Sequence, residues 1–378
     1  MKILLGITYY YPNISGVTLY AKRLAEGLVK RGNRVIVLTS RHDPSLPKRE
    51  TINGVEVIRS PVLLKIGKGV LMPFLPFQIF WFIRNCEVVN CHLPQFESFI
   101  FAVIGKFFGK KIILTHHTDL SGWKGFLNQL SEMAVWLGQL IAGAFADLIV
   151  PYTKDYADYS WYLRLFKTKL KYILPPILVG KIDKNLINKW KKEIGDNKYI
   201  IGFAGRIAKQ KGIPRLLQAI SFLKKQIGPN FKIVFAGPYK KVIGENYFKE
   251  IEDLIALYRG HLCFLGDILE DKMASFYSMC DVLVLPSDDR LESFGLVQAE
   301  AMLCGCPTVA TNLPGVRIPI RLTGMGETVS IGDSRALAKG ISMVLKKKEK
   351  YIKPKEEIEK IFNFDKTLEE YEKIFEEN

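Results

Sequence analysis

Short, wholly apolar runs alternate along the chain with longer segments of helical periodicity, and this alternation constrains the fold more than any other feature. Runs without a polar face are typical of strands buried on both sides of a parallel sheet. A strand, a helix and a second parallel strand form a βαβ unit, so the pattern predicts an α/β fold. The predicted strands of the first half are Lys2–Ile7, Val35–Leu38, Val88–Cys91, Ile112–Thr115 and Leu148–Val150.

A second series of such runs follows in the other half of the chain. Its predicted strands are Ile200–Ala204, Lys232–Ala236, Leu262–Leu265, Val282–Leu285 and Thr308–Ala310. Between the two series, Pro175-Pro176 and Gly180 interrupt the pattern. The 378 residues also suit two domains of about 150–200 residues each. We therefore predict two doubly wound, parallel-sheet domains, residues 1–175 and 176–359, and a last helix over residues 360–378.

Composition excludes several classes of protein. A hydrophobic content of 48% is too high for a disordered chain. The six cysteines form no CxxC pair and no zinc spacing, so a reducing, cytoplasmic compartment is predicted. The longest apolar run, Val70–Ile83, contains Pro73 and Pro76 and is shorter than the ~20 residues that span a membrane. No transmembrane helix is predicted.

Positive charge is concentrated in the first half of the chain. The whole chain carries a net charge of +16, and residues 1–180 hold 22 basic and 11 acidic residues, a net of +11. Such a half suits anionic partners such as lipid headgroups, and it equally fits an ordinary lysine-rich surface. No nucleic-acid-reading motif accompanies the charge, so no nucleic-acid partner is predicted.

Two segments of the basic half admit two interpretations each. Val70–Ile83 is either a loop with a core-packing helix or a segment that lies on a membrane, with Trp81 and the phenylalanines inserted. Phe96–Phe108 admits the same two interpretations. A peripheral association with an anionic membrane follows from the second interpretation.

A pair of carboxylates frames a strand–helix junction in the second half. Glu292 ends the loop after the strand Val282–Leu285, and Glu300 lies two turns into the next predicted helix. The first turn of that helix, with Ser293, Phe294, Gly295 and Leu296 at its start, offers backbone N–H groups and a positive dipole end to an anion. Carboxylates on either side of a bound phosphate can hold hydroxyl groups, which describes a site for a nucleotide sugar.

Two cations follow the strand Ile200–Ala204. Arg206 comes after Gly205, and Lys211-Gly212 follows five residues later. Ligands of open α/β sheets bind at the carboxyl ends of strands. A guanidinium there can grip a phosphate through two N–H groups, and an ammonium adds a point charge beside it.

These motifs together resemble the retaining glycosyltransferases of family 4. The resemblance rests on Glu292-Ser-Phe-Gly-Leu with Glu300-Ala-Met, on Gly305-Cys-Pro-Thr-Val-Ala, and on Gly205-Arg with Lys211-Gly. It implies the GT-B fold, in which two Rossmann-like domains face a central cleft and the last helix packs back on the first domain. It also implies transfer of a sugar from a nucleotide-diphosphate donor, with retention of the anomeric configuration. No D-x-D motif follows a predicted strand, and Asp288-Asp289 has no spaced partner, so neither a divalent metal nor another cofactor is predicted.

The same resemblance implies roles for individual residues. Arg206, Lys211 and the backbone at Ser293–Leu296 would hold the donor diphosphate, Glu292 the sugar hydroxyls and Glu300 the ribose. In Thr115-His-His-Thr-Asp119, His117 corresponds to a histidine that contacts the donor sugar. Leu265, in Phe264-Leu-Gly266, belongs to a segment that contacts the base through its backbone.

The loop after the first strand departs from the family pattern. The family usually has two consecutive glycines there, and this chain has Ser15-Gly16, so Gly16 alone would let the backbone approach a ligand. The acceptor would lie on the first domain, as a lipid or a lipid-linked saccharide at the cytoplasmic membrane face. Another GT-B enzyme, such as a nucleotide-sugar epimerase or a phosphorylase, and a non-catalytic basic binding protein stay open as alternatives.

Overall fold

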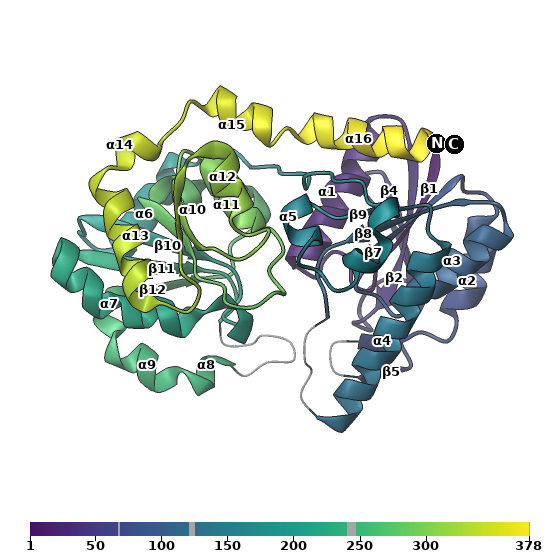
Figure 1. Cartoon of the computed structure of the whole chain (residues 1–378), viewed down its shortest axis with the longest axis horizontal. Coiled ribbons are helices and arrows are strands. Elements are labelled where there is room, and N and C mark those ends of the chain that lie inside the picture. Colours follow the sequence, from purple (N-terminus) through teal and green to yellow (C-terminus); the bar gives the residue numbers. More distant parts are fainter. Residues whose placement is uncertain (67–68, 121–124, 240–246, 378) are drawn as a thin grey trace. The chain divides into compact units, whose positions relative to one another are not determined.

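The computed structural model describes residues 1–66, 69–120, 125–239 and 247–377 (Figure 1). Contacts between residues divide the chain into two units. Unit 1 comprises Met1–Pro176 and Asn363–Asn378, and unit 2 comprises Ile177–Phe362. Each unit is built on its own mostly or wholly parallel sheet, which confirms the predicted α/β class with two Rossmann-like domains.

The sheet of unit 1 has the strand order β3-β4-β2-β1-β7-β8-β9, and every neighbouring pair is parallel except β3 with β4. A separate antiparallel pair, β5 with β6, follows β4. The strands are β1 (Lys2–Gly6), β2 (Arg34–Arg41), β3 (Arg49–Ile52), β4 (Val55–Pro61), β5 (Leu64–Ile66), β6 (Gly69–Leu71), β7 (Val88–Leu93), β8 (Lys111–His116) and β9 (Leu148–Val150).

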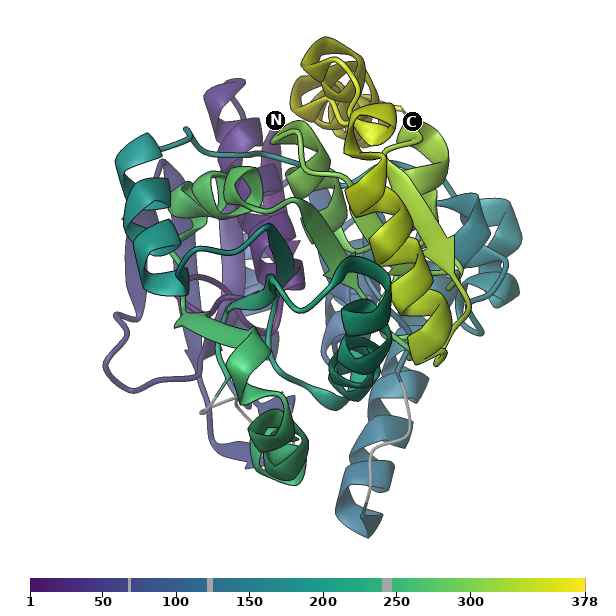
Figure 2. The same ribbon diagram turned by 90° about the vertical axis from the view of Figure 1, so that its left-hand side faces the viewer.

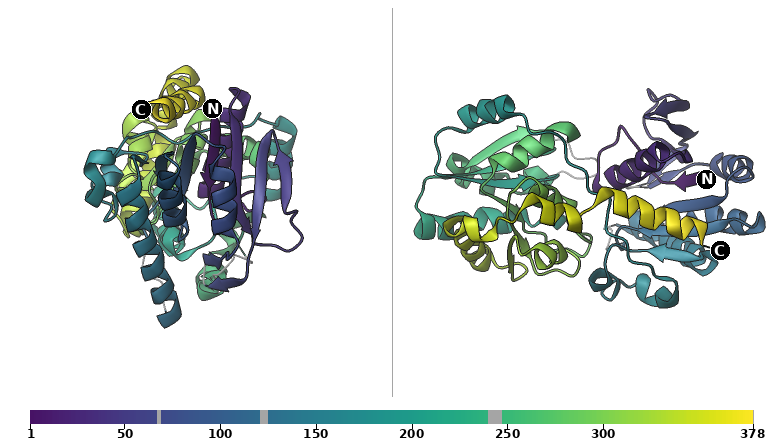
Figure 3. Two further views of the ribbon diagram at one scale, coloured as in Figure 1. Left: turned by 90° about the vertical axis from the view of Figure 1, so that its right-hand side faces the viewer. Right: turned by 90° about the horizontal axis from the view of Figure 1, so that it is seen from above.

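Helices cover both faces of this sheet. They are α1 (Gly16–Lys30), α2 (Leu75–Ile83), α3 (Ser98–Phe107), α4 (Phe126–Phe145), α5 (Lys154–Ala157), the 3-10 helix η1 (Leu163–Lys169) and α16 (Phe364–Glu376). The last of these, α16, lies beside α1 (Figure 3). Tyr371 of α16 is fully buried, and its hydroxyl is 2.7 Å from that of Tyr20 in α1. The end of the chain is therefore part of the core of unit 1.

The sheet of unit 2 has the order β12-β11-β10-β13-β14-β15, with every neighbouring pair parallel. Numbered within the unit, this is the order 3-2-1-4-5-6 of a dinucleotide-binding fold, whose direction of winding reverses between β10 and β13. The strands are β10 (Tyr199–Ala204), β11 (Phe231–Ala236), β12 (Leu262–Gly266), β13 (Val282–Leu285), β14 (Thr308–Thr311) and β15 (Gly326–Val329).

Alternate residues of the strands of unit 2 pack into two separate hydrophobic cores, one on each face of the sheet. Ile201 and Phe203 of β10 pack with α7 and α13 on one face, whereas Ile200 and Ala204 pack with α6, α10 and α11 on the other. The α-helices are α6 (Lys184–Ile194), α7 (Ile213–Ile227), α8 (Tyr247–Glu250), α9 (Glu252–Leu257), α10 (Met273–Met279), α11 (Leu296–Leu303), α12 (Ile318–Thr323), α13 (Ser334–Lys346), α14 (Lys348–Tyr351) and α15 (Lys355–Ile361). The 3-10 helices are η2 (Lys209–Lys211), η3 (Arg259–His261) and η4 (Glu270–Lys272).

Candidate functional site

The winding of the sheet in unit 2 reverses between β10 and β13, and the loops that leave these two strands carry most of the predicted site residues. Arg206 follows β10 directly, after Gly205, whose φ of 136° is available to glycine. The guanidinium of Arg206 is half-buried and makes no hydrogen bond or ion pair with the part of the chain that the structure describes. This cation is therefore available to a ligand at the carboxyl end of β10.

Gly212 fixes the two loops against each other. It adopts the left-handed conformation, with φ 63° and ψ 24°, and starts α7. A Cβ at this position would lie 1.9 Å from the carbonyl oxygen of Pro286, the residue after β13. Only glycine permits both the backbone angles and this close approach.

Lys211, the residue before Gly212, forms an ion pair across the two loops. Its Nζ donates a short hydrogen bond to Oε2 of Glu292. The side chains are 19% and 15% exposed, respectively, so the pair is largely shielded from water. The structure thus brings together a cation and a carboxylate that are 81 residues apart in the sequence.

The N-terminus of α11 follows Glu292. Gly295 takes the N-cap position with a φ of 76°, and no side chain of a described residue caps the backbone N–H groups of the first turn, which begins at Leu296. Ser293 and Phe294 are buried, and the side-chain amide of Gln298 donates to the carbonyl oxygens of Phe294 and Val316. The turn is therefore held from inside the unit. The N–H of Gln298 donates to the carbonyl oxygen of Gly295, while the N–H groups of Leu296 and Val297 have no partner among the described residues and stay available to an anion.

Glu300 lies in the body of α11 and is 6% exposed. Its Oε2 accepts a hydrogen bond of 2.6 Å from the hydroxyl of Tyr277 in α10. Glu300 is therefore held by the neighbouring helix α10, whereas Glu292 is held by Lys211 in the loop after β10.

The carboxyl ends of β11 and β12 complete this edge of the sheet with bare backbone. The N–H of Gly237 donates to the carbonyl oxygen of Gly266 over 2.7 Å, and Leu265 next to it is half-buried. A Cβ at Gly237 would lie 2.6 Å from the carbonyl oxygen of Gly205. Glycines at the ends of three adjacent strands therefore form a surface that a flat ligand can approach closely.

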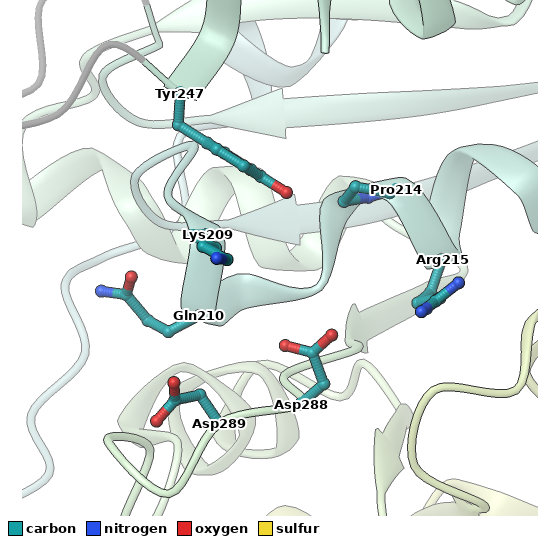
Figure 4. A pocket seen from close by; sticks show the side chains of 7 residues that line it. All are labelled: Lys209, Gln210, Pro214, Arg215, Tyr247, Asp288 and Asp289. Carbon is teal, nitrogen blue, oxygen red and sulfur yellow. The ribbon is translucent and has the colours of Figure 1, made fainter. Parts of the chain in front are cut away.

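A pocket of about 260 Å³ opens between the same two loops, which also carry Lys211 and Glu292 (Figure 4). In Figure 4 the side chain of Tyr247 points toward Pro214 from one side of the turn that carries Lys209 and Pro214, and the carboxylate of Asp288 points toward this turn from the other side. The residues that line the pocket are Lys209, Gln210, Pro214, Arg215, Tyr247, Asp288 and Asp289. None of these residues was predicted from the sequence, although most of them lie within a few residues of Lys211 or Glu292.

In unit 1, His117 lies just beyond β8 and is 2% exposed. One ring nitrogen, Nε2, is 2.7 Å from Nδ1 of His92, and the other forms a short hydrogen bond with the hydroxyl of Tyr152. Burial lowers the pKa of His117 well below its usual value, and His92 and His116 lower it further. The structure thus places a neutral, doubly hydrogen-bonded imidazole inside unit 1, and its contact with a donor sugar stays a prediction.

The network around His117 reaches the last helix. The ring of Tyr20 packs edge-on against that of His117, with centroids 4.9 Å apart, and the hydroxyl of Tyr20 meets that of Tyr371. Tyr371 also bonds to Oγ1 of Thr115, over 3.0 Å. Sequence reasoning missed this network because its members come from several separate elements.

The loop after β1 ends at the start of α1. Ser15 is the N-cap, and its Oγ accepts the N–H of Thr18 over 3.2 Å. Gly16 is the first residue of the helix and is exposed. That Gly16 lets the backbone approach a ligand closely stays a prediction.

Glu97, before α3, is a further buried acid that the sequence analysis did not assign. It is 4% exposed, and its Oε1 makes no hydrogen bond within the described residues. Burial raises the pKa of Glu97 to about 7. Its charge also contributes to the raised pKa of Tyr9, which places Glu97 near the loop after β1. The sequence signal was a single acid within the apolar segment Phe96–Phe108.

Among the residues that the structure describes, no group of three or more His, Cys, Asp and Glu side chains is arranged to hold a metal ion.

Two Rossmann-like units, with cations and an open helix N-terminus at the winding reversal of the second, define a GT-B protein that is suited to a phosphate-bearing ligand. Comparisons with known proteins agree. Residues 185–361 match the family model "Glycosyl transferases group 1", and residues 14–177 match "Glycosyltransferase Family 4". The chain belongs to the glycosyltransferases, in the family 4 type.

Full-length relatives support this assignment. An uncharacterized glycosyltransferase of Methanocaldococcus jannaschii is 27% identical over 370 residues, covering 91% of this chain and 89% of the relative. The N-acetyl-alpha-D-glucosaminyl L-malate synthase of Bacillus anthracis is 23% identical over 401 residues, covering 99% and 97%.

Solved structures show the same fold. Anabaena HepE in complex with UDP-glucose superposes with a TM-score of 0.77 at 19% identity, covering 99% of each chain. The sucrose-phosphate synthase of Thermosynechococcus elongatus superposes with a TM-score of 0.76 at 20% identity, covering 99% of this chain and 98% of that one.

Proposed function

We propose that this enzyme transfers a sugar from a nucleotide-diphosphate donor to an acceptor with retention of the anomeric configuration, and that unit 2 holds the donor. The proposal rests on the groups that the structure brings together at the carboxyl ends of the adjacent strands β10 and β13. There, Arg206 has no partner among the described residues, and Lys211 and Glu292 form a shielded pair. The uncapped N-terminus of α11 starts at Leu296, four residues after Glu292. Two cations and free N–H groups match a diphosphate, and the carboxylate matches sugar hydroxyls.

Each group has a distinct task in this proposal. Arg206, Lys211 and the N–H groups at Phe294–Leu296 stabilise the charge that develops on the departing diphosphate. Glu292 holds the sugar hydroxyls and, through its hydrogen bond to Lys211, also fixes the position of that cation. Glu300 is oriented by Tyr277 and accepts hydrogen bonds from the ribose.

The reaction requires no protein nucleophile. The acceptor hydroxyl attacks the anomeric carbon on the face that the diphosphate leaves, and a departing phosphate oxygen takes the proton of the hydroxyl. The charge that the diphosphate gains is met by fixed cations, so no divalent metal is needed in this proposal. His117 would assist from unit 1 only after its ring becomes accessible, since both its nitrogens are engaged.

The acceptor in this proposal is a lipid or a lipid-linked saccharide at the cytoplasmic face of a membrane. The basic first half of the chain supports it, with 22 basic and 11 acidic residues in positions 1–180. UDP-glucose is the first donor to test, because the Anabaena structure with the same fold is a complex with it.

A thermal-shift screen of UDP-, GDP- and ADP-sugars tests the donor site. A matching donor at 100 times its Kd should stabilise unit 2 by about 2.7 kcal/mol. Glu300→Gln should abolish the shift, since the amide carries no charge and has a single oxygen acceptor, with an NH2 donor in place of the second oxygen. Glu252→Gln is the matched control, because Glu252 is an exposed acid of unit 2 in α9. An unchanged shift in Glu300→Gln would remove Glu300 from the donor site.

The reaction itself is tested by the products. A transferase releases a nucleoside diphosphate only when an acceptor is present, and it does so in EDTA if no metal is required. Interconversion of donor sugars without an acceptor would identify an epimerase, and a requirement for inorganic phosphate would identify a phosphorylase. Donor binding without turnover under any of these conditions would identify a binding protein. The anomeric configuration of the product, read by NMR, decides retention.

A further inference from the structure

Helices α2, α3 and α4 form one layer on a single face of the sheet in unit 1. Ile79 of α2, Phe101 of α3 and Ala142 of α4 are buried in the same core cluster. Helix α3 contacts both of the others, so the three helices are neighbours. Their inner side therefore provides the core that a covering layer of an α/β unit must provide.

The outer side of α4 is also apolar. In a helix that covers a globular core, the outer side is ordinarily polar. Here a row of exposed apolar side chains follows the helix at spacings of three and four residues: Phe126, Leu130, Met133, Leu137, Ile141 and Phe145. Glu132 is the single charged residue among the 20 of the helix. At 1.5 Å per residue the row is about 30 Å long, and α4 projects from the rest of unit 1 (Figure 1 and Figure 2).

The other two helices extend this apolar surface. Phe77 and Trp81 of α2 are 75% and 67% exposed, and Phe107 of α3 is 81% exposed. Monomeric proteins seldom leave to water apolar side chains of this size and number on neighbouring helices. None of the helices that the structure describes is both long and apolar enough to cross a membrane.

Cations lie at the carboxyl ends of α2 and α3. The guanidinium of Arg84 stacks on the ring of Phe80 at 4.1 Å, and Lys110 donates to the carbonyl oxygen of Arg84. Lys106 pairs with Asp147. Aromatic side chains flanked by cations are typical of segments that lie in the headgroup region of a bilayer.

We propose that the outer face of α2, α3 and α4 docks on an anionic lipid bilayer, with the row on α4 inserted below the headgroups. Charge favours a bilayer over a second copy of this chain, because a second copy would bring together two halves that each carry a net charge of +11 over residues 1–180, whereas anionic headgroups neutralise this charge. The proposal rests on the proposed function only in that a membrane-borne acceptor would explain why a transferase needs such a face.

Flotation of the full chain with vesicles tests the docking face. The protein should float with phosphatidylcholine vesicles that contain 30% phosphatidylglycerol, and less with pure phosphatidylcholine. In Met133→Gln/Leu137→Gln, two half-exposed side chains lose their apolar groups, and the partition coefficient should fall on the order of tenfold or more. Glutamine is a good helix former, so α4 should persist.

Leu322→Gln is the matched control, because Leu322 is 47% exposed on α12 of unit 2 and Leu137 is 49% exposed. It should float like the wild type. A protein that stays in the soluble fraction with anionic vesicles, a double variant that floats normally, or a concentration-dependent dimer that the double variant abolishes would each overturn the proposal. The donor thermal shift, measured on the same samples without vesicles, separates a failure of docking from a failure of the donor site.

Discussion

Gly212→Ala should damage both the stability of unit 2 and its proposed donor site, and the structure gives the size of the stability loss. Alanine in the left-handed conformation costs about 1–2 kcal/mol. Its Cβ would also lie 1.9 Å from the carbonyl oxygen of Pro286, whereas ordinary contacts of a Cβ begin at 3.4 Å. The two loops must therefore separate by about 1.5 Å, and overpacking of this kind costs about 1–3 kcal/mol. The expected loss of unfolding free energy is the sum, about 2–5 kcal/mol.

Gly324→Ala is the matched control for the backbone term. Gly324 ends α12 with φ 68° and ψ 9°, close to the angles of Gly212. The atom nearest to a Cβ at this position would be Cε of Lys353 at 3.7 Å, an ordinary contact at the end of a flexible side chain. This substitution should cost only the conformational part, about 1–2 kcal/mol.

Urea titration with pulsed hydrogen exchange, read on peptides of unit 2, is the suitable assay, because a two-unit chain need not unfold in one step. Donor affinity, measured in parallel by calorimetry, should fall further in Gly212→Ala than in Gly324→Ala. The reason is that the shift carries the segment from Pro286 to Glu292 away from Lys211. Equal losses of free energy in the two variants, or an unchanged donor affinity in Gly212→Ala, would refute the reasoning.

Three other substitutions have defined outcomes. Lys211→Met should cost about 1–3 kcal/mol of stability by leaving Glu292 unpaired; adding Glu292→Gln should restore stability in urea titrations but not turnover in the diphosphate-release assay. Tyr371→Phe leaves the hydroxyl of Tyr20 without its partner. The free energy of unfolding of unit 1 should therefore fall by about 1–3 kcal/mol, and the amides of α16 should exchange hydrogen faster. Glu97→Gln removes a carboxyl whose pKa burial raises from 4.5 to about 7. Because the fold disfavours the ionised form, this variant should stabilise unit 1 by up to about 3 kcal/mol above pH 7, with the gain declining to zero as pH falls to 4.5 in urea titrations at each pH.

The strands that the sequence reveals are those buried on both sides. All six residues of β7 are buried, as are all four of β13, and such runs are conspicuous because no polar residue interrupts them. Most strands that sequence reasoning missed lie at edges or outside the main sheets; the exception is β4, which lies between β3 and β2 and whose apolar residues are interrupted by Glu56 and Arg59. In β3 (Arg49–Ile52), at an edge of the sheet in unit 1, exposed and half-buried residues alternate. In β15, at an edge of the sheet in unit 2, Val329 is the single buried residue. Short, half-solvated strands resemble loops in composition.

The sheet topology explains why the proposed donor site in unit 2 was easier to predict from the sequence than the surroundings of His117 in unit 1. Parallel strands bring the loops after β10 and β13 to one edge, so cations after one strand and a carboxylate after the other meet whatever their separation in sequence. The surroundings of His117 depend instead on register. His92 pairs with Thr115 across β7 and β8, which places His92 next to His117, and no local pattern encodes that register.

The sequence of α4 also did not reveal which side of the helix is buried and which is exposed to water. Its sequence is apolar on most sides, and periodicity alone cannot tell which side faces the core. The structure places the small residues Gly138, Ala142 and Gly143 inside, where a Cβ at Gly138 would lie 2.7 Å from the carbonyl oxygen of Phe96. Gly138 packs against Phe96 and Phe99, and Gly143 packs against Tyr162 and Phe166. Close packing on the inner side of α4 thus uses the small residues and leaves the large ones outside. The large apolar side chains of α4 stay exposed to water in the folded chain. Removing them from water would lower the free energy, and the interior of a bilayer offers an apolar environment in which this favours binding.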